Sequence, residues 1–419
     1  MVVSTPPATN AQVFSTADTY MDIPLLFSTR IIRLFCYGFL SLVLTLYLIE
    51  TGLTMGQAGL IFAFTLAGDA GITLLLTTHA DRFGRKRTLL LGALLMIGAG
   101  IAFLLTQNII LLITAAIIGV ISPSGHEIGP FLSVEQAGLS QLVSNEKRTQ
   151  VFAWYNLVGS FATAAGSGVG GWAASALQAG GLSALESYRV VLAGYSVGGG
   201  VLFILFLNLS SALEVRAHTQ QNTIFGLHRS RAVVLRLSAL FALDAFAGGL
   251  IVQSLLVYWF QKNFGAEVGD LGKIFAGTNI LAGVSALAAV PLAKRFGLIN
   301  TMVFTHIPSN ILLILLPFMP TLPLAIGLLL VRFSISQMDV PTRQSYTLAV
   351  VDPDERSAAS GVTVIARSVG ASVSPMLAGF FFSIPMLLSA PIILCGGIKI
   401  VYDLLLFRAF SALKPPEET

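Results

Sequence analysis

Twelve apolar segments, each long enough to cross a lipid bilayer, constrain this chain more than any other feature. A transmembrane helix needs roughly 20 mostly apolar residues to span the hydrocarbon core. The qualifying segments are Leu25–Leu48, Gln57–Thr78, Thr88–Leu105, Ile109–Val134, Val151–Leu177, Val190–Leu207, Val233–Phe260, Leu271–Leu292, Thr301–Met319, Leu322–Tyr346, Ser357–Phe382 and Pro385–Phe407. Because backbone polar groups in lipid must be paired within the chain, the sequence predicts an all-α polytopic membrane protein.

The composition supports the same class of protein. Of the 419 residues, 55% are hydrophobic and only 11% are charged, whereas about 25% of residues are charged in a typical soluble domain. The 40 glycines suit closely packed membrane helices. The net charge of +4 comes from basic residues spread along the chain, so nucleic-acid binding is not expected.

Several kinds of chemistry have no support in the sequence. Cys36 and Cys395 both lie inside apolar segments, so neither a disulfide framework nor a metal site is expected. No Gly-Lys-Ser/Thr phosphate-binding sequence occurs, so ATP-driven transport is not expected. We therefore expect neither an enzyme nor a bound cofactor.

One long polar connector divides the twelve segments six and six. The expected organisation is a mobile cytoplasmic tail (1–22), a six-helix bundle (23–209), a cytoplasmic loop (210–232), a second six-helix bundle (233–410) and a C-terminal tail (411–419). Most of the 24 lysines and arginines fall on the side that holds both chain ends. Basic residues stay on the cytoplasmic side, so both termini are predicted to be cytoplasmic.

An internal repeat relates the two predicted bundles. Arg82-Phe83-Gly84, after the second segment, returns as Arg295-Phe296-Gly297 after the eighth, and the preceding helix aligns without a gap. Such duplication is typical of transporters. A second alignment, of Leu142–Arg148 with Val350–Arg356, leaves five extra residues in the first half. The prolines and glycines of Ser122–Pro130 predict a helix break there, near His126 and Glu127.

The run after the second segment resembles the signature of the major facilitator superfamily. The matching residues are Asp81, Arg82, Gly84, Arg85 and Lys86, while Thr77 replaces a glycine. The resemblance implies twelve helices in two pseudo-symmetric six-helix halves. It also implies that Asp81 meets the N-terminal end of helix eleven, near Ser357, and helps to close the cytoplasmic side. In the second copy Lys294 replaces the aspartate, whereas Arg295 and Gly297 remain.

A glycine run in the fifth segment resembles the antiporter signature of the exporters in this superfamily. Gly166, Gly170 and Gly171 match it, while Ala162 and Ser167 replace a glycine and a proline. The resemblance implies export and a smooth helix face on which helix eight rocks. The alternative is ordinary glycine-rich helix packing.

Charged residues deep within the apolar segments are the candidate pathway for solute and protons. A charge at bilayer depth costs about 3 kcal/mol on insertion scales. The deepest are Asp69, Glu127, Asp244, Arg332 and Arg367, with His126 beside Glu127.

Asp69 and Arg367 each lie roughly 17 Å from the cytoplasmic ends of their helices. In the family, helices two and eleven pack together across the halves. We therefore expect Asp69 and Arg367 to form an ion pair in one access state and to separate in the other. A static pair, or two residues facing separate water-filled pockets, is the alternative.

Asp244 and Arg332 lie on helices seven and ten, which line the central cavity in the family. A carboxylate that exchanges its cation between states takes up and releases a proton, so Asp244 is a candidate proton carrier. The alternative is that Asp244 and Arg332 only neutralise each other. His126 is a candidate proton relay or a residue bonded to a neighbouring helix.

Two further pairs are predicted to be structural. Asp339 and Arg343 share a helix face at a spacing of four residues, and so do Lys399 and Asp403.

Together these features predict a secondary transporter that moves a small solute by alternating access. Export in exchange for protons is the first expectation, and an uptake symporter, a uniporter and a non-transporting membrane sensor are the alternatives. The expected partners are a small solute, protons and the lipid bilayer. We expect a monomer in the bacterial inner membrane.

Overall fold

The computed structural model describes residues 16–127, 129–143, 145–210, 213–214, 228–352 and 355–413, with side chains described within them except at 16–20, 77–82, 145–149 and 357. All regular elements in these ranges are helices. The first group, here called the N-half, comprises α1 (Thr16–Glu50), α2 (Met55–Phe83), α3 (Arg85–Leu105), α4 (Ile109–Ile118), α5 (Phe131–Leu142), α6 (Asn145–Ala179) and α7 (Ala184–Leu207).

The second group, here called the C-half, has the same plan. It comprises α8 (Arg231–Gly249), α9 (Gln253–Phe264), α10 (Val268–Phe296), α11 (Leu298–Leu315), η2 (Leu316–Phe318), α12 (Leu322–Ile335), α13 (Asp339–Ala349), α14 (Arg356–Phe382), η3 (Pro385–Leu387) and α15 (Ala390–Phe410).

The predicted twelve membrane spans are confirmed, but three of them are broken. The fourth span is α4 with α5, the seventh is α8 with α9, and the tenth is α12 with α13. Only the break in the fourth span was predicted. The first helix also begins at Thr16, well before the predicted Leu25, and Arg30 and Arg33 within it are buried.

The break in the fourth span follows from its glycines and prolines. Gly125 and Gly129 have φ angles of 73° and 77°, a left-handed conformation that only glycine adopts without strain. Pro123 and Pro130 remove two backbone donors. The segment between α4 and α5 therefore crosses mid-membrane as irregular backbone, buried among neighbouring helices.

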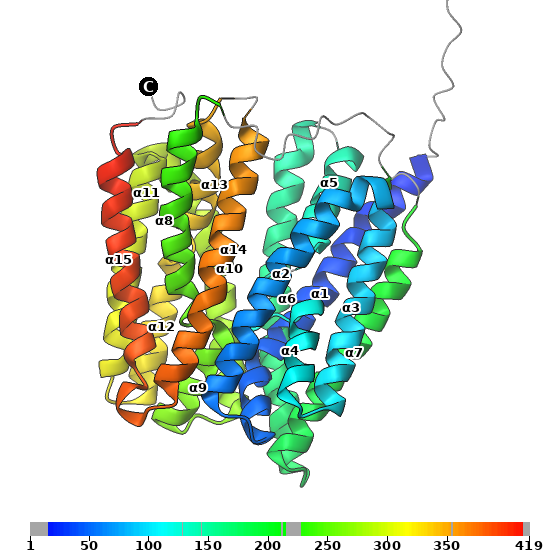
Figure 1. Ribbon diagram of the computed structural model, residues 1–419, viewed down its shortest axis with the longest axis vertical. Helices are drawn as coiled ribbons and strands as arrows, with labels where there is room; N and C mark the ends of the chain where they lie inside the picture. Colours follow the sequence, from blue (N-terminus) through cyan, green and yellow to red (C-terminus); the bar gives the residue numbers. More distant parts are fainter. Residues whose placement is uncertain are drawn as a thin grey trace, which may run out of the picture.

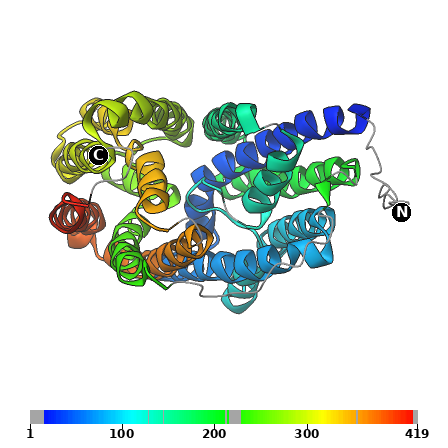
Figure 2. The ribbon, with the colours of Figure 1, turned by 90° about the horizontal axis from the view of Figure 1, so that it is seen from above.

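The two halves lie side by side, and four long helices join them. Helix α2 packs against α14, and α6 packs against α10. Figure 1 shows the halves meeting at the lower end and α5 standing apart from α13 at the upper end. Figure 2, seen from above, shows α1 of the N-half turned toward the C-half. We call the end that holds the start of α1 and the end of α15 the terminal face, and the opposite end the closed face.

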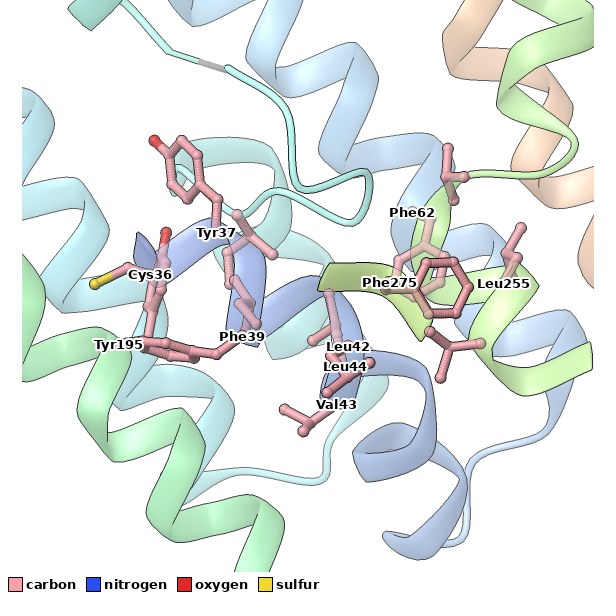
Figure 3. Packing of buried hydrophobic residues seen from close by; sticks show 14 of the residues in the cluster. Cys36, Tyr37, Phe39, Leu42, Val43, Leu44, Phe62, Tyr195, Leu255 and Phe275 are labelled. Carbon is pink, nitrogen blue, oxygen red and sulfur yellow. The ribbon is translucent and has the colours of Figure 1, made fainter. Parts of the chain in front are cut away.

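The closed face is held by close helix contacts and by one continuous core. Gly59 of α2 packs directly on Pro375 and Gly379 of α14. Figure 3 shows apolar residues of α1 beside Phe62, Leu255 and Phe275 of α2, α9 and α10. Among the described side chains, hydrogen bonds between the halves all involve Gln253 and Ser254, at the start of α9. The contacts that hold the halves together are therefore concentrated away from the terminal face.

A buried carboxylate organises the terminal face of the C-half. Glu355 precedes α14, and its carboxylate accepts the backbone N–H groups of His228, Arg229 and Ser230 just before α8. Burial disfavours the charged form, but the N–H donors outweigh it and lower the pKa of Glu355 from 4.5 to about 2. The side chain thus joins the beginnings of two helices.

Replacing Gly59 by valine should open the closed face. A Cβ at Gly59 would lie 2.4 Å from the carbonyl oxygen of Pro375, so α2 and α14 must separate. Spin labels at Thr54 and Met386, both exposed at the closed face, should report a longer-distance population in Gly59→Val. The matched control is Gly71→Val in the same helix, where a Cβ meets nothing within 4 Å. Equal distance distributions in the two variants would contradict this packing.

Glu355→Gln should destabilise the protein in a pH-dependent way. Because the folded state lowers the pKa of Glu355, its contribution to stability is present above pH 4.5 and is lost as the pH falls toward about 2. Thermal unfolding in detergent should therefore give a lower Tm for Glu355→Gln at pH 6. The difference from the unsubstituted protein should shrink steadily below pH 4.5. A difference that stays constant down to pH 3 would show that the carboxylate charge is irrelevant.

Candidate functional site

The N-half holds a buried ion cluster between α1 and the fourth span. Arg33 is fully buried, and its Nε lies 2.6 Å from Glu127 while its Nη2 lies 2.7 Å from Glu135. Arg30 donates to Glu127 at 2.8 Å. Two arginines therefore face two glutamates, and the four charges neutralise one another.

Neighbouring groups fix the N-half cluster in place. The Tyr155 hydroxyl and the Thr29 hydroxyl both donate to Glu135, and the Arg30 guanidinium lies 4.2 Å above the Tyr155 ring. Sequence analysis missed this cluster because it counted Arg30 and Arg33 among the basic residues of the cytoplasmic side and did not single out Glu135. The spacing of the two arginines by three residues on one helix face was the available signal.

His126 and Glu127 are adjacent in sequence, but their side chains lie in different environments. Glu127 turns into the arginine cluster, whereas the His126 side chain is exposed. His126 lies three residues after Pro123, whose carbonyl oxygen accepts two hydrogen bonds from Ser254 of the C-half. His126 is therefore an exposed side chain three residues from an inter-half contact.

Asp69 stands without a cation among the described side chains. Its carboxylate accepts the Gly129 backbone N–H and the Thr73 hydroxyl. The predicted pair with Arg367 is absent in this conformation, because Arg367 is bound to Asp244.

The C-half holds a second cluster, centred on Asp244. Lys399 lies 2.5 Å from Oδ1, while Arg367 and Arg343 share Oδ2 at 3.1 Å and 3.2 Å. Arg343 also reaches Asp339 at 2.8 Å, which confirms that predicted pair. One buried carboxylate therefore holds three cations from α13, α14 and α15.

Two pairs that the sequence suggests in the C-half, the alternative Asp244–Arg332 pair and the predicted Lys399–Asp403 pair, are not formed in this conformation. Arg332 does not reach Asp244: its Nε is buried without an acceptor among the described residues, and its guanidinium lies 4.8 Å over the Phe333 ring. The sequence did not predict the break at Ser336–Met338, so Arg332 and Asp339 do not lie on one continuous helix.

Lys399 turns to Asp244 instead of Asp403, because α15 packs against α8. Asp403 instead contacts His306 Nδ1 at 2.8 Å and Asn310 at 3.3 Å, both on α11. Sequence reasoning missed His306, and no spacing within one helix could have shown which neighbouring helix Asp403 faces.

The structure describes only part of the motif that is predicted to close the cytoplasmic side. The side chains of Asp81, Arg82 and Ser357 lie outside the described ones. Gly84 and Gly297 have φ angles of 104° and 84°, which explains why glycine occurs at both turns. The Arg295 guanidinium lies 5.2 Å over the Phe296 ring.

Arg85 and Lys86 form hydrogen bonds that connect the beginning of α3 to the end of α7 and the residues that follow it. Their backbone N–H groups donate to Glu214 at 2.8 Å and 3.2 Å, so Glu214 occupies the positive N-terminal end of α3. Lys86 Nζ donates to the carbonyl oxygens of Leu207 and Leu209. This part of the motif stabilises the N-half internally.

The glycines of the fifth span contact two different partners. A Cβ on Gly166 or Gly170 would collide with the α1 backbone at Phe35 or Phe39. Gly171 instead packs against Gly272 and Val268 of α10, the eighth span. Only Gly171 therefore lies where the resemblance implies a sliding surface.

A separate apolar groove of about 410 Å³ lies between α3 and α4. Leu105 and Leu111 in its wall are exposed, and no charged residue lines it. It is distinct from the ion clusters and has no feature that would recognise a polar solute.

Asp244→Asn should destabilise the protein strongly. Removing one partner from a buried ion pair costs about 3–5 kcal/mol because the remaining charges are left buried. Denaturant or thermal unfolding in detergent should show this loss, and adding Lys399→Met should recover part of it. Asp270→Asn is the control, because its pair with Lys273 is exposed and is worth roughly 0–1 kcal/mol. Equal losses in the two aspartate variants would show that Asp244 does not hold the cluster.

Comparisons with known proteins agree with this architecture. Residues 26–375 match the model of the Major Facilitator Superfamily. "Uncharacterized membrane protein YJR124C" of Saccharomyces cerevisiae is 31% identical over 421 residues, covering 93% of this chain and 94% of that protein. The nucleoside transporter NupG has a TM-score of 0.74 at 14% identity, over 93% of this chain and 98% of that one.

A bacterial homologue of the human lysosomal transporter Spinster, in an inward-facing and occupied conformation, has a TM-score of 0.71 at 16% identity. That match covers 94% of this chain and 97% of the other. These two structures share the fold. The family match and the yeast relative show that this chain belongs to the major facilitator superfamily of membrane secondary transporters.

Proposed function

We propose that this transporter moves a small solute by alternating access, and that Arg367 exchanges its carboxylate partner as the terminal face closes. The observation that carries the proposal is the sharing of Asp244 by Arg343, Arg367 and Lys399, while Asp69 has no cation among the described side chains. The positive-inside rule makes the terminal face cytoplasmic, so this conformation would be the one open to the cytoplasm.

Asp69 and Arg367 lie at matching depths on helices that already touch. Helices α2 and α14 run antiparallel and meet where Gly59 packs on Pro375 and Gly379. At 1.5 Å per residue, Asp69 lies about 15 Å from that contact toward the terminal face, and Arg367 lies about 12–18 Å from it. If the parts of α2 and α14 nearest the terminal face came together, the side chains of Asp69 and Arg367 would therefore approach each other.

The exchange is favourable because Asp244 does not depend on Arg367 alone. When Arg367 leaves, Lys399 and Arg343 still neutralise Asp244, so no uncompensated buried carboxylate is created. Asp69 gains a cation in the same step. The pairing would stabilise the state closed at the terminal face and leave the open state intact.

The same exchange supplies a route for proton coupling. A carboxylate that gains a cation releases its proton more readily, so Asp69 would lose a proton when Arg367 arrives. Export in exchange for protons is our first proposal, and uptake together with protons is the alternative. Proton gradients of either sign across proteoliposomes separate the two directions, and a uniporter would respond to neither.

The membrane that houses the protein is a proposal of the same kind. The sequence expectation was the bacterial inner membrane, while the yeast relative favours a eukaryotic membrane equally.

A double-mutant cycle tests the exchange. Spin labels at Gln150 on α6 and Phe296 on α10, both exposed near the terminal face, report whether that face is open or closed. Asp69→Asn and Arg367→Met should each reduce the closed population. The double variant should resemble either single one, since both remove the same contact. In the unsubstituted protein the closed population should increase with pH, and Asp69→Asn should abolish that increase.

Additive effects of the two substitutions would contradict the exchange. Because an altered charge can disturb folding, each variant must first retain the short distance component between the closed-face labels at Thr54 and Met386, whose population changes with the access equilibrium but whose position should not. The combined reversal Asp69→Arg with Arg367→Asp gives an independent check, since it should restore closure that either reversal alone removes.

A further inference from the structure

We propose that the transported solute carries a negatively charged group, and that Arg367 on the C-half wall binds that group. The inference rests on the alternating-access mechanism proposed above, because it assigns the open-state ligand of the same arginine.

The C-half carries an excess of positive charge within the membrane. Within the predicted spans, its described charged side chains that are buried or half-buried are four cations, Arg332, Arg343, Arg367 and Lys399, three carboxylates, Asp244, Asp339 and Asp403, and His306, whereas Arg236 and Lys273 are exposed. Asp403 is bound by His306 and Asn310. Two carboxylates are therefore left to neutralise four cations, and the balance stays positive in either protonation state of His306.

Arg367 is the cation of this group that a solute can reach. Its side chain is 33% exposed, against 8% for Arg343 and 12% for Lys399. It projects from α14, which together with α13 lies on the side of the C-half that faces α1 in Figure 2. A guanidinium also presents a planar pair of donors that suits carboxylate and phosphate groups.

An anion can bind to Arg367 without leaving Asp244 unneutralised. Arg367 makes one hydrogen bond to Asp244, on an oxygen that Arg343 already contacts, and Lys399 holds the other oxygen. An incoming anion can therefore take Arg367 without leaving Asp244 unpaired. It would also offset the surplus positive charge, which is expensive at membrane depth.

The opposite wall disfavours a cationic solute. Glu127 is bound by both Arg30 and Arg33, and Asp69, which has no cation among the described side chains, takes Arg367 in the proposed exchange. A cation would have to displace a guanidinium to reach Glu127. His126 and Asn156 are the exposed polar side chains of this wall, and they suit the uncharged part of a solute.

The sign of the potential in the cavity can be measured without knowing the solute. Gln344 directly follows Arg343 on α13 and is exposed. A cysteine at Gln344, with Cys36 and Cys395 replaced by serine, can be modified by anionic sulfonatoethyl or cationic trimethylammonioethyl methanethiosulfonate. The anionic-to-cationic rate ratio should exceed that of a Ser411→Cys reference by about tenfold, since a charged cleft raises the local concentration of counter-ions.

Substitution of Arg367 then identifies the residue responsible. Arg367→Met should return the rate ratio at Gln344→Cys toward the reference value, whereas Arg408→Met, at an exposed position on the end of α15, should leave it unchanged. A ratio equal to the reference, or one that favours the cationic reagent, overturns the anionic solute. A raised ratio that Arg367→Met does not change overturns the assignment to Arg367.

Different results would contradict the anion site at Arg367 and the exchange of Arg367 during alternating access. The reagent rates depend on the charge of the open cavity, while the labels at Gln150 and Phe296 report closure of the terminal face. An electropositive cavity in a protein whose terminal face never closes would refute alternating access by the Arg367 exchange and leave the anion site standing.

Discussion

The structure depends on the way one buried carboxylate, Asp244, holds three cations from three different helices. A single ion pair in lipid would be costly to separate, because removing one partner leaves a buried charge without compensation. Sharing changes this: Arg343 and Lys399 keep Asp244 neutralised whether or not Arg367 stays. The C-half can thus contain a half-buried cation, Arg367, whose departure would leave Asp244 neutralised, as the proposed exchange requires.

The two halves share one arrangement of helices, but their buried charged clusters differ. In the N-half, Arg30 and Arg33 match Glu127 and Glu135, and Tyr155 and Thr29 satisfy the remaining oxygen atoms. That cluster is balanced and closed, as expected of a fixed support. The C-half cluster is unbalanced and partly open. Pseudo-symmetry of the backbone therefore does not extend to the electrostatics, and the proposed exchange of Arg367 begins in the C-half.

Sequence reasoning predicted the twelve spans, their division into halves and the break near His126, because apolar length and proline–glycine content are local properties. It also found Asp69, Asp244 and Arg367 as buried charges. It failed on partners: Asp244 binds Lys399 rather than Arg332, and Asp403 binds His306. Pairing depends on how each helix is rotated against its neighbours. The breaks at Leu250–Val252 and Ser336–Met338 contain no proline, so a helix drawn straight through them places residues on the wrong face.

The interrupted fourth span has an evolutionary consequence. Because the backbone there is not helical, the Pro123 carbonyl oxygen is free to accept both the backbone N–H and the hydroxyl of Ser254, and the same hydroxyl reaches the Ser41 carbonyl oxygen. On the N-half side, the bonds to Ser254 are made by peptide groups, which every amino acid carries, whereas Gln253 uses the hydroxyls of Ser41 and Ser167. Side chains that line the cavity can therefore diversify among descendants toward new solutes while the Ser254 part of the joint is inherited unchanged.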